Sequence, residues 1–395
     1  MVPEPMIPVD DSINLSNHKN LENKIGTIAD KIRTQGEKRR ALSELIRNVK
    51  KDVEVPDDEE RGPVESKLVY PVEDRSLEDL KVAGVDGGVL TKPLHGLDLI
   101  LVRAVVTMFQ YEDGDLKDVD YHPSEVPAPQ LVNVHEPLDS KELDLLTGLK
   151  RQLTELQRAY EVLKEVDLDV MVLDGSIVPQ YIHKASKERT KELYEKVIET
   201  YGKIYKTATR NEVLLIGAVE DSRSTRLTSI FEEDIFPEIL ENADLSEKDR
   251  FKFNENKDVV MESRDTAFLD YLLGAGERSF TFKYSKAPSS LLSDLHPWAK
   301  RVRAFYMKPV EYDRPTRVEF LTNPKNPKKT IERTASLVNS LSASHDACAL
   351  PSVLIEADAR ASLSQEEITI LRDNIADQLE PSTMMDLRRD RRPFK

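Results

Sequence analysis

The sequence predicts a mixed α/β fold, in which helices flank a sheet and a helical appendage precedes it. From about residue 80 onward, short apolar and β-branched runs alternate with longer segments of helical periodicity. Before them, a helical stripe is followed by an acidic, proline-containing stretch. We therefore divide the chain into an appendage with its linker (1–75) and a main domain (76–395), with residues 228–262 as an insertion.

The appendage carries an apolar stripe on an otherwise basic helix. Leu21, Ile25, Ile28 and Ile32 follow 4-3-4 spacing, and the stripe resumes at Leu42, beyond Gly36. The pattern fits one amphipathic helix or a helical pair. Its apolar face either packs on its own domain or docks a partner subunit. The acidic linker runs from residue 52 to residue 65.

The main domain opens with strands and then alternates strands with helices. We expect strands over 82–90, 97–111 and 116–121, which would form an antiparallel meander. Helices are expected over 139–166 and 184–207. We expect strands over 170–177 and 212–219; the apolar run in the first indicates burial on both faces of the sheet, and Val213 to Ile216 make the second a buried strand.

The acidic insertion at 228–262 is only weakly periodic, and regular elements follow it. We expect strands near 279–284, 302–312 and 318–320. Helices are expected over 265–273 and near 330–342 and 365–378.

Composition narrows the classes of protein and site. The chain has 395 residues, a net charge of −15 and a single cysteine, Cys348, which excludes an intrachain disulfide and a multi-cysteine zinc site. No apolar run is long enough to span a bilayer, and the first residues lack a signal-peptide pattern, so we expect a cytoplasmic protein without membrane contact. The acidic charge argues against a broad nucleic-acid-binding surface.

The last nine residues reverse that charge balance. They hold Arg388, Arg389, Arg391, Arg392 and Lys395 against a single acid. This end of the chain is either a solvated tail or an arm that contacts phosphate or a partner.

Three acids carry the chemistry that the sequence suggests. Asp86 and Asp174 each follow an apolar strand and precede small residues, and Glu155 lies on the helix between these strands, off its apolar stripe. Read singly, each Asp-Gly pair is a common hairpin signal, and Glu155 could face solvent. Read together, three carboxylates from separate elements can hold a divalent cation against a phosphate.

Six segments, in order, resemble the NurA nuclease family, archaeal enzymes of DNA-end processing. They span about residues 80 to 380 and are 85–88 (VDGG), 151–159 around Glu155, 173–176 (LDGS), 216–223 (IGAVEDSR), 317–319 (RVE) and 350–358 (LPSVLIEAD). The resemblance implies an RNase H-like domain with Asp86, Glu155 and Asp174 as catalytic acids that bind Mn²⁺ or Mg²⁺.

The resemblance also implies further ligands and contacts. Asp358 stands where the family often has histidine and is a candidate fourth metal ligand, and Glu220 stands where lysine is frequent. Arg223, Arg317, Arg388 and Arg389 are candidate DNA contacts.

The family's properties imply activity and partners for this chain. They are 5′-to-3′ exonuclease and single-strand endonuclease activity on DNA, a homodimer that surrounds a narrow DNA channel, and cooperation with a hexameric HerA-type translocase in resecting double-strand breaks for recombination.

Two other functions fit parts of the pattern. Actin-like ATPases and sugar kinases also use Asp-Gly turns, but they need a second glycine-rich phosphate loop, which we do not find among 14 glycines. A catalytically inactive scaffold for a DNA translocase is the non-enzymatic alternative.

Overall fold

The computed structural model describes residues 11–50, 53–55, 64–179, 188–284, 294–379 and 386–387. Most of the predicted linker lies outside these ranges, and so do Arg388 and Arg389. In the part of the chain that is described, no helix combines the length and the apolar character that crossing a membrane requires.

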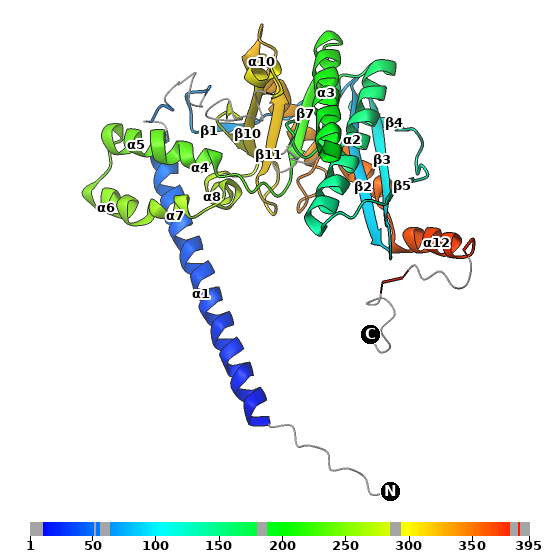
Figure 1. Cartoon of the computed structure of the whole chain (residues 1–395). Helices are drawn as coiled ribbons and strands as arrows, with labels where there is room; N and C mark the ends of the chain where they lie inside the picture. The colour runs from blue at the N-terminus through cyan, green and yellow to red at the C-terminus, as the bar shows by residue number, and fades with distance from the viewer. Residues whose placement is uncertain are drawn as a thin grey trace, which may run out of the picture.

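One mixed sheet of eleven strands organises the described chain (Figure 1). Its main path runs β1-β8-β10-β11-β7-β6-β2-β3-β4, with β5 paired to β3 and β9 paired to β10. The strands are β1 (Val69–Pro71), β2 (Lys81–Pro93), β3 (Asp98–Glu112), β4 (Asp115–His122), β5 (Gln130–Val134), β6 (Val170–Asp174), β7 (Leu214–Val219), β8 (Glu277–Ser279), β9 (Phe282–Lys283), β10 (Val302–Lys308) and β11 (Thr316–Leu321).

The part of the sheet formed by β4-β3-β2-β6-β7 confirms the predicted mixed α/β fold. β2, β3 and β4 form an antiparallel meander, and β6 and β7 then add parallel to β2. Helices α2 (Ser140–Glu165) and α3 (Glu188–Arg210) supply the crossovers before β6 and β7. This is the strand order expected of an RNase H-like sheet. The short strands β1 and β5 were not predicted.

Helices cover both faces of this sheet. Helices α2 and α3 pack on one face, where Val85 and Leu173 point into the core. The other face carries Val82 and Val172 and is covered by α10 (Pro327–Ser342) and α11 (Ser352–Ala361). The sequence analysis identified α10 but gave no helix over α11. Burial on both faces explains why β7 and all of β6 before Asp174 are apolar.

A second core lies at the β8 end of the sheet. It joins the end of α1 (Asp11–Val49) to β1, β9, β10 and the helical segment that follows β7. That segment contains α4 (Arg226–Ile230), a π-helical turn (Phe231–Ile235), α5 (Phe236–Asn242), α6 (Glu247–Asn256), α7 (Asp258–Met261) and α8 (Asp265–Leu272). Phe231 packs edge-on against Phe268 and Phe236. Residues 228–262 are therefore helical and contribute to this core, although their sequence shows little periodicity.

The predicted appendage is one continuous helix that passes through Gly36. Its last turns are buried at Leu42, Ile46 and Val49, and Arg47 forms an ion pair with Glu277 (Nη1 to Oε2, 2.6 Å). Its first half projects away from the body of the molecule (Figure 1), and Leu21, Ile25, Ile28 and Ile32 are 56–65% exposed. The stripe thus divides: the second half packs on its own chain and the first half does not.

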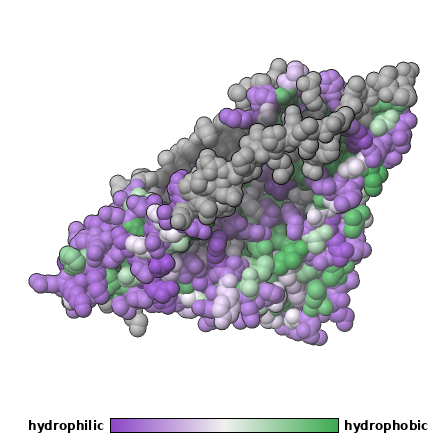
Figure 2. Space-filling view, turned by 90° about the horizontal axis from the view of Figure 1, so that it is seen from below, coloured by the Kyte–Doolittle hydropathy of each residue, from purple (hydrophilic) through white to green (hydrophobic). Residues whose placement is uncertain are grey.

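An ion pair fastens the last described helix to the sheet. Helix α12 (Gln365–Ala376) begins with a capping box formed by Ser364 and Glu367. Arg103 of β3, which is buried, forms an ion pair with Glu367 and donates to the Ser362 carbonyl oxygen over 2.8 Å. The described surface is largely hydrophilic on the face seen in Figure 2, in keeping with the acidic composition.

The divided stripe on α1 gives a matched pair of isoleucines. Ile46 is fully buried and Ile28 is 59% exposed on the same helix. We expect Ile46→Ala to lower the free energy of unfolding by about 2 to 4 kcal/mol through cavity formation, and Ile28→Ala to change it by less than about 0.5 kcal/mol. Urea unfolding of the two variants measures this difference. Equal losses would contradict the burial of the second half of α1 in the domain core.

Candidate functional site

Asp86 and Asp174 occupy neighbouring positions on parallel strands. The β2–β6 ladder ends with Val85 opposite Leu173, so the two aspartates follow at the next step of both strands. Side chains alternate along a strand, which places both carboxyl groups on the face covered by α11. Asp86 itself lies inside β2, because Gly87 and Gly88 continue the strand. The hairpin interpretation of this Asp-Gly pair is therefore wrong.

Glu155 approaches the two aspartates from the opposite face of the sheet. Helix α2 starts at a capping box of Asp139 and Glu142 and brings Glu155 against Gly87 of β2. A β-carbon at position 87 would lie 2.6 Å from Glu155 Oε1, so only glycine leaves room for this carboxylate. The solvent-facing interpretation of Glu155 is wrong, since its side chain is only 12% exposed. We call Asp86, Glu155 and Asp174 the acid cluster.

Helix α11 closes the cluster from the other side. A β-carbon at Gly88 would lie 2.3 Å from the Ala361 carbonyl oxygen, and one at Gly84 would lie 2.9 Å from the Val353 backbone. These glycines let α11 lie flat on β2, which brings Asp358 to the rim of the cluster. Asp358 is exposed and lines a cavity with Asp86 and Asp174.

Two cavities open on the acid cluster and meet at Arg151 and Asp174. One lies on the α2 side and is lined by Glu155, Ser176 and Tyr201, and the other lies on the α11 side and is lined by Asp86, Glu220 and Asp358. Arg151 is the one cation among the described residues that line them. Its Nε is 3.4 Å from Glu155 Oε1, and its Nη1 donates to the Gly87 carbonyl oxygen over 3.4 Å.

Burial is the main cause that raises the pKa values of the three acids in the cluster. Burial, with the charges of Asp174 and Glu155, raises the pKa of Asp86 to about 8. Burial also raises the pKa of Glu155 to about 7, although Arg151 opposes this shift. The pKa values of Asp174 and Glu220 are raised as well, chiefly by burial. At neutral pH the carboxyl groups of Asp86 and Glu155 are therefore partly protonated unless a cation neutralises them.

The donor set fits a hard divalent cation. Carboxylate oxygens are the ligands that Mg²⁺ and Mn²⁺ prefer, and buried Oε1 of Glu155 accepts no hydrogen bond from any described residue. Among the residues that the structure describes, no three His, Cys, Asp or Glu side chains already converge closely enough to hold an ion. A shared ion would therefore require side-chain rotation within the cluster.

The arginines predicted to contact DNA lie in different environments. Arg223 is exposed in the loop after β7. Arg317 is buried on β11, a central strand, where its Nε donates to Glu319 Oε1 over 2.8 Å, and it is not placed on a surface that DNA could reach. Arg388 and Arg389 lie outside the described residues.

Sequence reasoning missed two charged residues near the cluster. Arg151 precedes Glu155 by one helical turn, a spacing that indicates an ion pair on a helix. Glu319 is 2% exposed and contacts the segment after Asp174. The sequence places Glu319 in an apolar strand but gives no sign of what it contacts.

Comparisons with known proteins point to one family. The NurA domain model matches residues 80–363. The crystal structure of the NurA nuclease from Sulfolobus solfataricus superposes with a TM-score of 0.54 at 13% identity, covering 95% of this chain and 100% of that one. A crystal structure of NurA bound to dAMP and manganese has a TM-score of 0.48 at 12% identity and covers 92% and 98%. No curated protein sequence matches.

The raised pKa of Asp86 gives a prediction for the protein in EDTA. Because the folded state binds this proton more tightly than the unfolded state, the stability of the wild type should fall as pH rises from about 4 to 8. Asp86→Asn removes the titrating group, so it should be more stable than wild type by about 1 to 3 kcal/mol at pH 8.5, with a smaller difference at pH 5. Urea unfolding at both pH values measures this, and a difference independent of pH would contradict the shift.

Proposed function

Because this chain belongs to the NurA family, we propose that it is a divalent-metal-dependent DNA nuclease whose catalytic acids are Asp86, Glu155 and Asp174. The observation that carries the proposal is the grouping of three carboxyl groups from β2, α2 and β6, one buried and two half-buried, with two open cavities in front of them. Such a cluster is unfavourable without a cation, which is typical of sites that bind one.

Each acid has a role that its position supports. Asp86 and Asp174, side by side on parallel strands, would hold a shared Mn²⁺ or Mg²⁺ ion, with Glu155 reaching it across Gly87 and Asp358 adding a ligand from α11. Such an ion supplies Lewis acidity to the phosphoryl oxygens and lowers the pKa of attacking water. Arg151, between the two cavities, would neutralise phosphate charge and orient the backbone of the bound DNA strand.

We propose the finer activities on the family's pattern. They are 5′-to-3′ exonuclease and single-strand endonuclease activity on DNA, in the resection of double-strand breaks. The proposed partners are a second copy of the chain and a hexameric HerA-type translocase. A dimer with a basic channel and an acidic exterior would reconcile the net charge of −15 with a DNA substrate.

Cleavage of 5′-labelled linear DNA tests the activity. We expect wild type to cut single- or double-stranded DNA with Mn²⁺ or Mg²⁺ and not in EDTA, and Asp86→Asn to lose about 100-fold or more of the rate. Asp169→Asn is the matched control, because Asp169 accepts from Lys81 N (3.0 Å) at the opposite end of the same two strands, and it should retain activity.

The outcome of this assay separates the alternatives. Full activity of Asp86→Asn in a folded protein would overturn the site assignment. If wild type is silent, the assay is repeated with a HerA-type translocase. Silence with the translocase present would overturn the nuclease proposal in favour of a scaffold.

We further propose that the exposed half of α1 contacts a partner subunit. Its apolar side chains recur with the 4-3-4 spacing of a coiled-coil seam and lie open on a projecting helix. Exposure of four large aliphatic side chains in a row is unfavourable for a helix that works alone.

Charge substitutions on this face test the contact. We expect Ile25→Asp with Ile28→Asp to weaken the affinity of assembly by about tenfold or more. Light scattering would then show less dimer, or less protein would co-elute with a HerA-type translocase. Thr27→Asp with Thr34→Asp places the same charges on the opposite face of the helix and should leave assembly intact. Unchanged assembly in the isoleucine variant would show that this face is not an interface.

A further inference from the structure

We infer that Glu319 is a positioning residue, which fixes the backbone after Asp174 and thereby aims the Asp174 carboxyl group into the acid cluster. The inference rests on the proposed function for what the cluster does, but its structural content stands on contacts around residues 175–177. Among the described residues, no hydrogen bond or ion pair joins Glu319 to the acid cluster directly. Its effect on the site passes through the chain that follows Asp174.

The backbone after Asp174 turns sideways across the sheet. Strand β6 ends at Asp174, and Gly175 adopts a positive φ of 83°, a conformation that favours glycine. The Gly175 N–H donates to the Ala218 carbonyl oxygen over 2.8 Å, which carries the chain over β7. A β-carbon at Gly217 would lie 2.5 Å from the Gly175 carbonyl oxygen and 2.9 Å from Ile177 N. Glycine at position 217 is therefore required for this close crossing.

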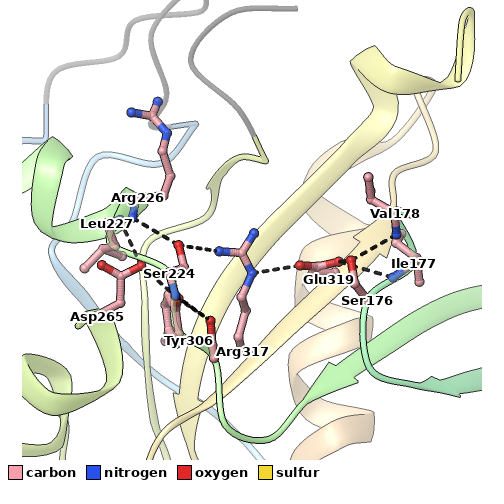
Figure 3. Close-up of polar contacts among 11 residues, drawn as sticks. Ser176, Ile177, Val178, Ser224, Arg226, Leu227, Asp265, Tyr306, Arg317 and Glu319 are labelled. Carbon is pink, nitrogen blue, oxygen red and sulfur yellow. Dashed lines mark hydrogen bonds and ion pairs between the residues drawn. The ribbon is translucent and has the colours of Figure 1, made fainter. Parts of the chain in front are cut away.

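Glu319 receives the segment on the far side of β7. It lies opposite Gly217 in the β7–β11 pairing, so its carboxylate faces the point where the segment arrives. Ser176 Oγ donates to Glu319 Oε2 over 2.6 Å, and the Ile177 N–H donates to the same oxygen over 3.2 Å. Figure 3 shows Ser176 and Ile177 meeting one side of this carboxylate while Arg317 meets the other.

An ion pair with Arg317 holds the Glu319 carboxylate in place in the core. Arg317 Nε donates to Glu319 Oε1 over 2.8 Å, and Arg317 Nη1 donates to Ser224 Oγ over 3.1 Å. Both side chains are at least 94% buried. A buried ion pair adds little net stability relative to apolar side chains, because desolvation offsets the attraction. Its geometric effect is to present one oxygen to Arg317 and the other to the segment after Asp174.

Tyrosines on α3 extend the anchor to the helix of Glu155. Tyr201 Oη donates to the Ser176 carbonyl oxygen over 3.1 Å, and Tyr205 Oη donates to the Ile177 carbonyl oxygen. Gln152 Nε2 donates to Tyr201 Oη over 3.2 Å, and Gln152 lies one turn before Glu155 on α2. The same network therefore touches the segment that follows Asp174 and the helix that carries Glu155.

Glu319→Gln tests the inference because an amide has only one acceptor oxygen. It cannot accept from Arg317 on one side and from Ser176 and Ile177 on the other. In EDTA we expect amide hydrogen exchange at residues 176 and 177 to accelerate about tenfold or more. We also expect Mn²⁺ binding, measured by calorimetry, to weaken about tenfold. With Mn²⁺ present, kcat on DNA should fall while KM stays within about twofold.

Glu65→Gln is the matched control. Glu65 pairs with buried Arg278 (2.7 Å) and accepts from the Thr281 N–H (2.7 Å), but it lies at the β8 end of the sheet. We expect it to lose similar stability in urea while keeping exchange at 176–177 and Mn²⁺ affinity unchanged. Equal effects of both variants on these readouts would overturn the positioning role.

A milder variant covers the case in which Glu319→Gln does not fold. Ser176→Ala removes one donor to Glu319 and leaves the ion pair, so it should shift the same readouts by a smaller factor. Unchanged exchange and Mn²⁺ affinity in the folded variants would overturn the inference. If wild type itself neither binds Mn²⁺ nor cuts DNA, the proposed function fails, and exchange at 176–177 alone then decides whether Glu319 anchors the segment.

Discussion

The register between β2 and β6 is the constraint on which the site depends. Parallel pairing that ends at Val85 and Leu173 forces Asp86 and Asp174 into adjacent positions, where burial and mutual repulsion raise the pKa of Asp86. A shift of one residue in either strand would turn one carboxyl group to the opposite face. This pairing places the Asp86 and Asp174 carboxyl groups side by side, and the helices, cavities and hydrogen bonds are arranged around them.

Glycines, which have no side chain, let other parts of the chain approach β2 and β7 closely. Glycine at 87 admits the Glu155 carboxylate, glycines at 84 and 88 admit α11, and glycine at 217 admits the turn after Asp174. The chain has only 14 glycines, yet several stand where a β-carbon would clash with backbone or with the Glu155 side chain. In this protein, glycine therefore shapes the site by leaving room for neighbouring groups as well as by allowing turns.

The two ends of the sheet differ in what they carry. The β4–β7 end carries the acid cluster, whereas the β8 end is covered by α1 and the helices of residues 226–272 around an aromatic core. Strand β11 links the two ends, since Glu319 and Arg317 contact the segment after Asp174 on one side and Ser224, before α4, on the other (Figure 3). The packing of the second core is thus physically connected to the geometry of the acid cluster.

Sequence alone determined the elements and the acids, because hydrophobic periodicity and Asp-Gly steps are local signals. It predicted β2–β4, α2, β6, α3 and β7 in order, and it selected Asp86, Glu155 and Asp174. Helix α11 and the helices of 228–262 escaped it, because they are short or weakly periodic and owe their burial to distant strands. Only the tertiary structure decided that Glu155 faces the sheet, that Arg317 is buried and that Glu319 holds the turn after Asp174. Those facts depend on which elements lie side by side, and no local pattern encodes contacts between residues far apart in the sequence.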